Sequence, residues 1–277
     1  MAVKTTSAQE NVSANDSPIY TLFGAEVTSV LTADTILRLA VGVVGAVLVK
    51  RFLPLHYARD IMRALEDIRL DSYDERLISP PILKLGPTAY DFYEKHALEA
   101  AYWDHAQRAV RARQRLLRGS DPMNLAIARL RNAWEGPVEL ARSGGRPMFA
   151  GIIREIRDGA KLHFDEITRE SPGLLDETPA SFLTLNWYFS VPETGGGTSV
   201  FKHPWHPRDE QHRDGYGYAE SVVENDPVAT VRPETGDALL FDTRNLHVVR
   251  PVTGPGRRVS LSFFLGVTRG GSLQLWS

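Results

Sequence analysis

The sequence predicts an α+β protein in which a helical layer packs against a C-terminal antiparallel β-sandwich. Helical patterns fill about residues 55–143, whereas about 146–277 alternate short runs rich in Val, Phe, Leu, Tyr and Thr with Gly, Pro and Asp turns. The composition, 43% hydrophobic and 24% charged over 277 residues, is that of a globular protein. Since β-rich domains with added helices often reach this length, we expect residues 19–277 to form one domain.

The N-terminal region shows no pattern typical of an export signal, and we expect none. Residues 1–18 are polar and lack an apolar period, so we expect a disordered tail. The most apolar stretch, Leu39–Val49, is shorter than the roughly 20 residues that span a bilayer, and it follows a polar leader. We interpret it as a buried strand or strand pair, and we expect a cytoplasmic protein with no membrane partner.

Three helices are expected in the first half of the chain. After a strand from Gly45 and a turn at Pro54, an amphipathic helix should run from Tyr57 to Leu70. Its apolar face consists of Ile61, Leu65 and Ile68. A second helix should cover about 89–117, and a third should start at Ser120-Asp-Pro and run through Trp134, because Pro favours the first helical position. Gly144-Gly145 should end the helical part.

The expected strands follow at short intervals. They are Phe149–Ile156, Phe182–Ser190, Ser199–Phe201, Ala229–Val231, Asp237–Phe241, His247–Val252 and Arg258–Gly266. The formal net charge of −2 gives no electrostatic case for a nucleic-acid partner. The absence of cysteine excludes disulfides, thiolate metal sites and cysteine nucleophiles.

A candidate metal site combines two separate segments. His163 and Asp165 are two residues apart, so on a strand both side chains would face one side. His247 follows the strand at Asp237–Phe241 and a turn. Two histidines and one carboxylate with open positions form the facial triad that binds Fe(II) in non-haem oxygenases.

An anion-binding pair lies eleven residues beyond the last histidine. Arg258 and Ser260 can face one side of the next strand, where a guanidinium and a hydroxyl suit a distant carboxylate. Arg257 is adjacent, so the sequence leaves open which arginine points inward. We interpret Arg257 as the solvated one.

These motifs, in this order, resemble the 2-oxoglutarate/Fe(II)-dependent dioxygenase superfamily. The similarity covers roughly Gly45 to the end. The segments Val191-Pro-Glu-Thr-Gly-Gly-Gly, Gly236-Asp-Ala-Leu-Leu-Phe and Trp276-Ser277 resemble its freestanding small-molecule branch, which includes N-acyl amino-acid hydroxylases and indole-alkaloid halogenases. The resemblance implies a double-stranded β-helix (jelly roll) with supporting N-terminal helices.

The resemblance also implies the cofactors and the roles of the site residues. His163, Asp165 and His247 match the iron ligands, and 2-oxoglutarate and O₂ are the implied co-substrates. Arg258 and Ser260 match the pair that binds the far carboxylate of 2-oxoglutarate. The strand from Phe182 places Thr184, Asn186 and Tyr188 on one face, and we expect Asn186 and Tyr188 near the co-substrate.

The expected reaction is hydroxylation of an unactivated C–H bond of a small molecule, such as an amino-acid derivative or natural-product intermediate. Related halogenases have Gly or Ala where this chain has Asp165, so the resemblance favours hydroxylation. Desaturation, cyclisation, halogenation or a non-catalytic jelly-roll binding protein are the alternatives. The sequence identifies neither the substrate nor the oligomeric state.

Other candidate sites have simpler interpretations. His203, His206 and His212 lie in a proline-containing segment that we interpret as a surface or pocket-lid loop, although a role for the first two stays open. Gly195-Gly-Gly-Thr lacks the Lys and helix of a phosphate-binding loop. His56, His96 and His105 are interpreted as ordinary helix-associated residues. Arg154 could meet an anionic substrate, but we interpret it as a surface charge.

Overall fold

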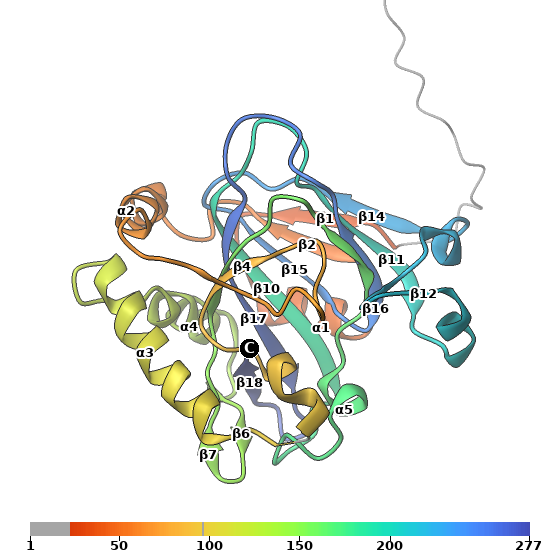
Figure 1. Cartoon of the computed structure of the whole chain (residues 1–277), viewed down its shortest axis with the longest axis horizontal. Helices are drawn as coiled ribbons and strands as arrows, with labels where there is room; N and C mark the ends of the chain where they lie inside the picture. Colours follow the sequence, from red (N-terminus) through yellow and green to blue (C-terminus); the bar gives the residue numbers. More distant parts are fainter. Residues whose placement is uncertain (1–22, 96) are drawn as a thin grey trace, which may run out of the picture.

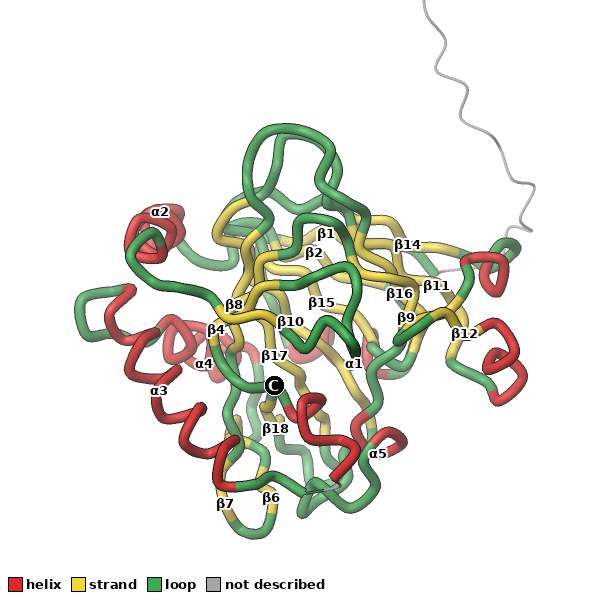
Figure 2. The backbone as a smooth tube through the Cα atoms, in the orientation of Figure 1, coloured by secondary structure: helices red, strands yellow, loops and turns green. Residues whose placement is uncertain are grey.

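The structure, a computed structural model, describes residues 23–95 and 97–277. It is a mixed α+β protein in which two largely antiparallel sheets carry the second half of the chain and helices lie outside them (Figures 1 and 2). The expected tail at 1–18 and the prediction for His96 fall outside the described residues. Within those residues, no helix is long and apolar enough to cross a membrane.

The larger sheet is ten-stranded and holds the central part of the molecule. Along its main path the strands are β1 (Ala25–Thr28), β2 (Ala46–Val49), β15 (Ala238–Asp242), β10 (Ser181–Ser190), β17 (Val259–Val267), β8 (Ile152–Glu155), β4 (Leu83–Leu85) and β3 (Asp71–Ser72). Beside β17 lie β18 (Leu273–Trp276) and then β5 (Val138–Leu140). The pairs β1–β2 and β18–β5 are parallel, and the other pairs of this sheet are antiparallel.

The smaller sheet is six-stranded and carries both histidines of the predicted metal site. Its order is β12 (Arg213–Asp214), β13 (Gly217–Tyr218), β9 (Ala160–His163), β16 (Asn245–Val249), β11 (Thr198–Pro204) and β14 (Val228–Val231). A separate hairpin joins β6 (Arg142–Ser143) to β7 (Arg146–Pro147). The seven expected strands all occur, with ends that shift by a few residues.

The helices are α1 (Ala33–Ala40), α2 (Leu55–Leu65), α3 (Ala100–Leu116), α4 (Pro122–Ala133) and the short α5 (Ile167–Glu170), with 3₁₀ helices η1 (Ala89–Lys95), η2 (Pro207–His212) and η3 (Glu220–Val223). Helices α1 to α4 pack on one face of the larger sheet, whereas η1 and α5 contribute residues to the pocket. Buried Ile61 of α2 and Leu130 of α4 pack in one core with Trp187 of β10. Since side chains alternate along a strand, the other face of β10 is left for the pocket.

Several expected boundaries were wrong. Leu39–Val49 is not a strand pair: Leu39 lies in α1, a turn at Gly42 (φ 74°) follows, and only β2 is extended. The helix expected to reach Leu70 ends at Leu65, and the region 89–117 divides into η1 and α3. The helical part ends at Ala133 rather than near Gly145, because the segment after it pairs as β5 with β18.

The start of α4 was predicted correctly. Asp121 caps the helix by accepting a hydrogen bond from the Met123 backbone N–H at 2.9 Å, and Pro122 occupies the first helical position. The same carboxylate pairs with buried Arg113 of α3 at 2.9 Å. The cap therefore also connects the two helices.

Candidate metal centre and pocket

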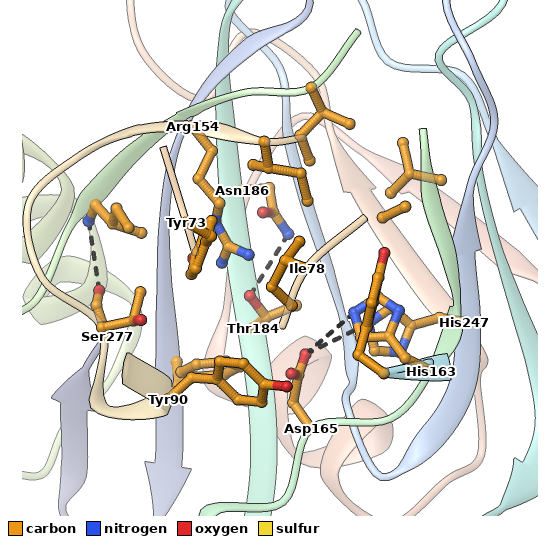
Figure 3. Close-up of a pocket in the computed structure, with 18 of the residues that line it drawn as sticks. Tyr73, Ile78, Tyr90, Arg154, His163, Asp165, Thr184, Asn186, His247 and Ser277 are labelled. Atoms are coloured by element: carbon orange, nitrogen blue, oxygen red, sulfur yellow. Dashed lines mark hydrogen bonds and ion pairs between the residues drawn. The ribbon is translucent and has the colours of Figure 1, made fainter. Parts of the chain in front are cut away.

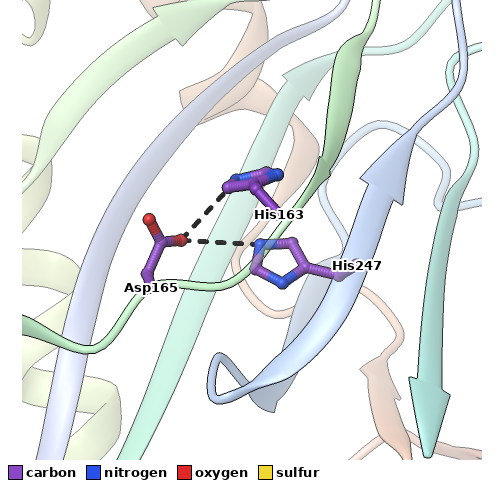
Figure 4. A group of neighbouring side chains, drawn as sticks. All are labelled: His163, Asp165 and His247. Carbon is purple, nitrogen blue, oxygen red and sulfur yellow. Dashed lines mark ion pairs between the residues drawn. The ribbon is translucent and has the colours of Figure 1, made fainter. Parts of the chain in front are cut away.

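The two histidines are brought together by strand pairing in the smaller sheet. His163 ends β9 and lies directly opposite His247 of β16, so both side chains project from the same face. Their ring centroids are 4.2 Å apart (Figure 4). This confirms the expectation that two distant segments converge.

The ring orientation of each histidine is set by its own strand. Nδ1 of His163 lies 2.7 Å from the Lys161 carbonyl oxygen, and Nδ1 of His247 lies 2.9 Å from the Asn245 carbonyl oxygen. A carbonyl accepts, so each Nδ1 carries the proton and donates it. Each Nε2 then has a free lone pair for a metal, which is the usual arrangement for a histidine ligand.

Asp165 completes the group from beyond the end of β9. Its Oδ2 lies 3.7 Å from Nε2 of His163 and 3.5 Å from Nε2 of His247. Thr243 holds its backbone in place, because Asp165 N–H donates to the Thr243 carbonyl at 2.9 Å and the Thr243 hydroxyl donates to the Asp165 carbonyl at 2.8 Å. One ligand atom from each of the three residues lies within 4.8 Å of the others.

The electrostatics of the group favour a bound cation. Burial, with help from His247, lowers the pKa of His163 to about 4. Burial alone would raise the pKa of Asp165, but His163, His247 and Arg154 together lower it to about 2. At neutral pH, His163 is therefore neutral and Asp165 is ionised, which are the protonation states that a metal requires. Two imidazoles and one carboxylate suit iron(II).

A pocket of about 1080 Å³, its open mouth included, extends from these residues between the two sheets (Figure 3). Its walls are largely apolar and aromatic: Tyr73, Ile78, Ile82, Tyr90, Tyr93, Ile152, Ile156, Phe164, Tyr216, Phe241, Val249 and Phe264. The polar part of the lining includes side chains from β10 and β11, Thr88, Glu170, Ser277 and two arginines. Such a cavity fits a small organic molecule.

Arg258 is buried in this pocket and contacts only neutral groups among the described residues. Its Nε donates to the Gly196 carbonyl at 2.9 Å, and its Nη2 donates to the Tyr188 hydroxyl at 3.0 Å and to the Thr198 hydroxyl at 3.1 Å. Arg257 points elsewhere and forms a bidentate pair with Glu155, at 2.9 and 2.7 Å. The arginine that faces the pocket is thus Arg258, as expected.

The other residues expected near the co-substrate lie on the same sheet face. Ser260 is directly opposite Tyr188, and Asn186 lines the pocket. The Ser260 hydroxyl lies 3.1 Å from that of Ser262, which donates to Oδ1 of Asn186 at 2.7 Å. Ser260 is fully buried behind the lining rather than in it.

Arg154 corrects one interpretation. It lines the pocket and is not a surface charge, because β8 pairs with β17 in a register that places Arg154 opposite Ser260. Its Nε is buried and has no hydrogen-bond partner among the described residues. The lining residues that the sequence analysis did not single out include Thr198, Tyr216 and Glu170, which no local pattern marks.

The histidines of the 203–226 segment have structural partners. His203 lies between two carboxylates, with Nδ1 2.7 Å from Asp226 and Nε2 3.1 Å from Asp209. Nδ1 of exposed His206 accepts from the Arg208 N–H at 3.2 Å and caps η2. Neither lines the pocket, although Tyr216 of the same segment does.

Comparisons with known proteins find similar sequences over most of the chain. A family model described as carrier-protein-independent halogenase WelO5 matches residues 27–272. The L-gamma-glutamyl-L-propargylglycine hydroxylase of Streptantibioticus cattleyicolor is 38% identical over 242 residues, which cover 86% of this chain and 90% of that protein. The leucinostatins biosynthesis cluster protein S of Purpureocillium lilacinum is 30% identical over 224 residues, covering 75% and 90%.

A solved structure shares the fold. An N-substituted L-amino acid dioxygenase from Burkholderia ambifaria AMMD superposes with a TM-score of 0.59 at 15% identity, covering 89% of this chain and 92% of that one. Together with the family match, these similarities confirm the family resemblance that the sequence motifs carry.

Proposed function

The chain belongs to the family of the carrier-protein-independent halogenase WelO5, and we propose that it is an Fe(II)- and 2-oxoglutarate-dependent oxygenase that hydroxylates a small molecule. The observation that carries this function is the convergence of two Nε2 lone pairs and one ionised carboxylate at the base of an apolar pocket. A facial set of three ligands leaves positions for a chelating co-substrate and for O₂.

The fold proposed for residues 19–277 is one domain built on a double-stranded β-helix. The strand sequence supports it: β8, β10, β15 and β17 lie side by side in the larger sheet, and β9, β16, β11 and β14 lie side by side in the smaller one. The chain thus passes between the sheets repeatedly, as in a jelly roll.

The proposed ligands of the iron are His163, Asp165 and His247. When bound, iron and 2-oxoglutarate supply the oxidising chemistry. The protein orients the reactants: the Lys161 and Asn245 carbonyls fix the imidazole rings, and Thr243 fixes the backbone of Asp165. The apolar walls exclude water from the reaction.

The far carboxylate of 2-oxoglutarate is proposed to bind Arg258. This guanidinium is buried without an acidic partner in the described chain and therefore has its charge available. Tyr188 and Ser260 are proposed to support it, and Asn186 to lie beside the co-substrate. All three lie on β10 or β17 on the same sheet face.

The proposed substrate is an amino-acid derivative or a natural-product intermediate. The hydroxylase relative is named for a γ-glutamyl amino acid, and the pocket is sized for a small organic molecule. We propose no nucleic-acid or membrane partner, and a cytoplasmic location stays a prediction.

The function is tested in two stages. Anaerobic titration of Fe(II) should give one equivalent bound by the native protein, whereas His163→Ala and His247→Ala should each bind far more weakly; His203→Ala, outside the pocket, is the control. A panel of amino acids, N-acyl amino acids and γ-glutamyl amino acids is then scored for succinate formation with Fe(II), 2-oxoglutarate and O₂. Full iron binding by either pocket variant would remove that histidine from the site.

A further inference from the structure

One row of side chains crosses the pocket face of the larger sheet and carries more positive charge than the proposed co-substrate requires. Strand register places Lys84 of β4 opposite Arg154 of β8, Arg154 opposite Ser260 of β17, and Ser260 opposite Tyr188 of β10. Directly opposed residues of a sheet share a face, so these four side chains lie on the same face of the sheet, and of the four Arg154 is the one that lines the pocket.

The two cations of this row differ in their partners. Lys84 is buried, with only 4% of its surface exposed, but it is paired with the Asp91 carboxylate. The same carboxylate also accepts a hydrogen bond from the Thr88 N–H. Arg154 forms no hydrogen bond or ion pair with any side chain in the described chain. A partly buried guanidinium without a counter-charge is unfavourable, so its retention points to an anionic ligand.

The charges of the occupied site leave Arg154 in excess. Iron(II) with Asp165 carries one net positive charge and Arg258 a second, and the doubly negative 2-oxoglutarate neutralises both. Glu170, the other carboxylate of the lining, accepts from the Glu166 backbone N–H at 3.0 Å and forms no ion pair with Arg154. One positive charge, that of Arg154, remains to be neutralised by the substrate.

We propose that Arg154 binds a carboxylate of the substrate, and that the substrate is an organic acid with an apolar body. The inference rests on the proposed function and assigns a specificity-determining residue within it. Figure 3 shows Arg154 across the pocket from the triad, with Thr184 and Asn186 between them. An acid anchored at Arg154 would therefore direct its other end toward His163, Asp165 and His247.

The apolar body of the substrate has its counterpart in the lining. Tyr73 lies beside Arg154 (Figure 3), and Ile152 precedes Arg154 by two residues on the same face of β8. Ile78, Ile82, Phe164 and Phe241 continue the apolar surface. A carboxylate held at one end and an apolar chain along these side chains would fix which carbon approaches the metal centre.

The test compares acids with their uncharged amides. Hexanoate, phenylacetate and N-acetyl-leucine, and the primary amide of each, are titrated into the anaerobic Fe(II)·2-oxoglutarate complex, with the perturbation of its charge-transfer absorption as the binding signal. In the native protein at least one acid should bind more tightly than its amide. In Arg154→Gln that preference should disappear, with a roughly ten- to hundred-fold rise in the acid's Kd.

Matched variants separate the possible outcomes. Arg257→Gln, whose arginine pairs with Glu155, should keep the acid preference, and Arg154→Lys should recover part of it. Unchanged amide binding shows that Arg154→Gln is folded. The proposal is overturned if no acid binds better than its amide, or if Arg154→Gln weakens only 2-oxoglutarate. Failure of the absorption band to form would count against the proposed function; calorimetry on metal-free protein would then still compare acid binding in Arg154→Gln and Arg258→Gln.

Discussion

At the scale of single residues, the adjacent Arg257 and Arg258 differ in their hydrogen-bond partners. Arg257 is neutralised by Glu155, whereas Arg258 has only hydroxyl and carbonyl partners in the described chain. A buried guanidinium in this state can bind an incoming carboxylate without first breaking an ion pair. Arg257 and Arg258 are therefore suited to different roles although they are adjacent in the sequence.

Arg258→Ala should raise the concentration of 2-oxoglutarate required for half-maximal binding. Loss of a charge-assisted hydrogen bond costs roughly 1.5–3 kcal/mol, or about ten- to a hundred-fold in affinity. Anaerobic titration of 2-oxoglutarate into the Fe(II) protein measures it. Arg257→Ala is the control and should have little effect; the opposite result would assign the co-substrate to Arg257.

Asp165 should decide the outcome of the reaction. Its carboxylate is ionised and lies within 3.5 Å of His247 Nε2, so it would fill the metal position that a halide needs and would repel the halide. The native enzyme should therefore hydroxylate even in excess chloride, although the family model is named for a halogenase. Mass spectrometry of the product checks this, and a chlorinated main product would exclude Asp165 as a ligand.

At the scale of elements, the helices fix the position of the strand that carries Arg154. Arg113 of α3 pairs with the Asp121 cap of α4 and also donates to the carbonyls of Ala150 and Gly151, just before β8. All of these groups are buried or nearly so. Arg113 thus joins two helices to the segment that leads into β8 of the larger sheet.

Asp121→Ala should lower the free energy of unfolding by roughly 3–5 kcal/mol, because it removes a helix cap and leaves Arg113 buried without a counter-charge. Asp121→Asn should cost less, since the amide oxygen can still cap α4. Urea unfolding measures both. Asp34→Ala, in the exposed first turn of α1 with a weak 3.9 Å pair to Arg38, should change stability by less than about 0.5 kcal/mol.

At the scale of the whole molecule, the pocket acids and bases make stability depend on pH. The pKa of His163 is lowered to about 4, so the unfolded chain binds a proton more readily and stability is lost as pH falls below about 6.5. The pKa of Glu170 is raised by burial and by Asp165 to about 8, so the folded chain holds a proton that the unfolded chain has released. The contribution of Glu170 to the free energy of unfolding is fully present below about pH 4.5 and is lost as the pH rises to about 8.

Between pH 6.5 and 8 the effect of Glu170 on the free energy of unfolding should be separable from that of His163, because His163 titrates at lower pH. In metal-free protein, native stability should fall relative to Glu170→Gln by up to about 1.4 kcal/mol per pH unit, because the amide does not titrate. Chemical unfolding at several pH values measures the difference. A constant difference across this window would show that Glu170 is ionised throughout.

The sequence alone determined the features that depend on local pattern. Alternation along 182–190 predicted that Thr184 and Asn186 share one face of β10, and both line the pocket; the Asp-Pro pair at 121–122 predicted the start of α4. The spacing of His163, Asp165 and His247 predicted a metal group whose three ligand atoms the structure brings together. These features were readable because side-chain periodicity and capping chemistry act over a few residues.

Tertiary structure decided what depends on strand register and on distant partners. Register placed Arg154 in the pocket row, while its charge alone suggested the surface. Pairing with β18 turned Val138–Leu140 into a strand, and Thr243 positioned Asp165 beyond the end of β9. In each case the deciding contact joins residues far apart in sequence, so no local pattern could encode it.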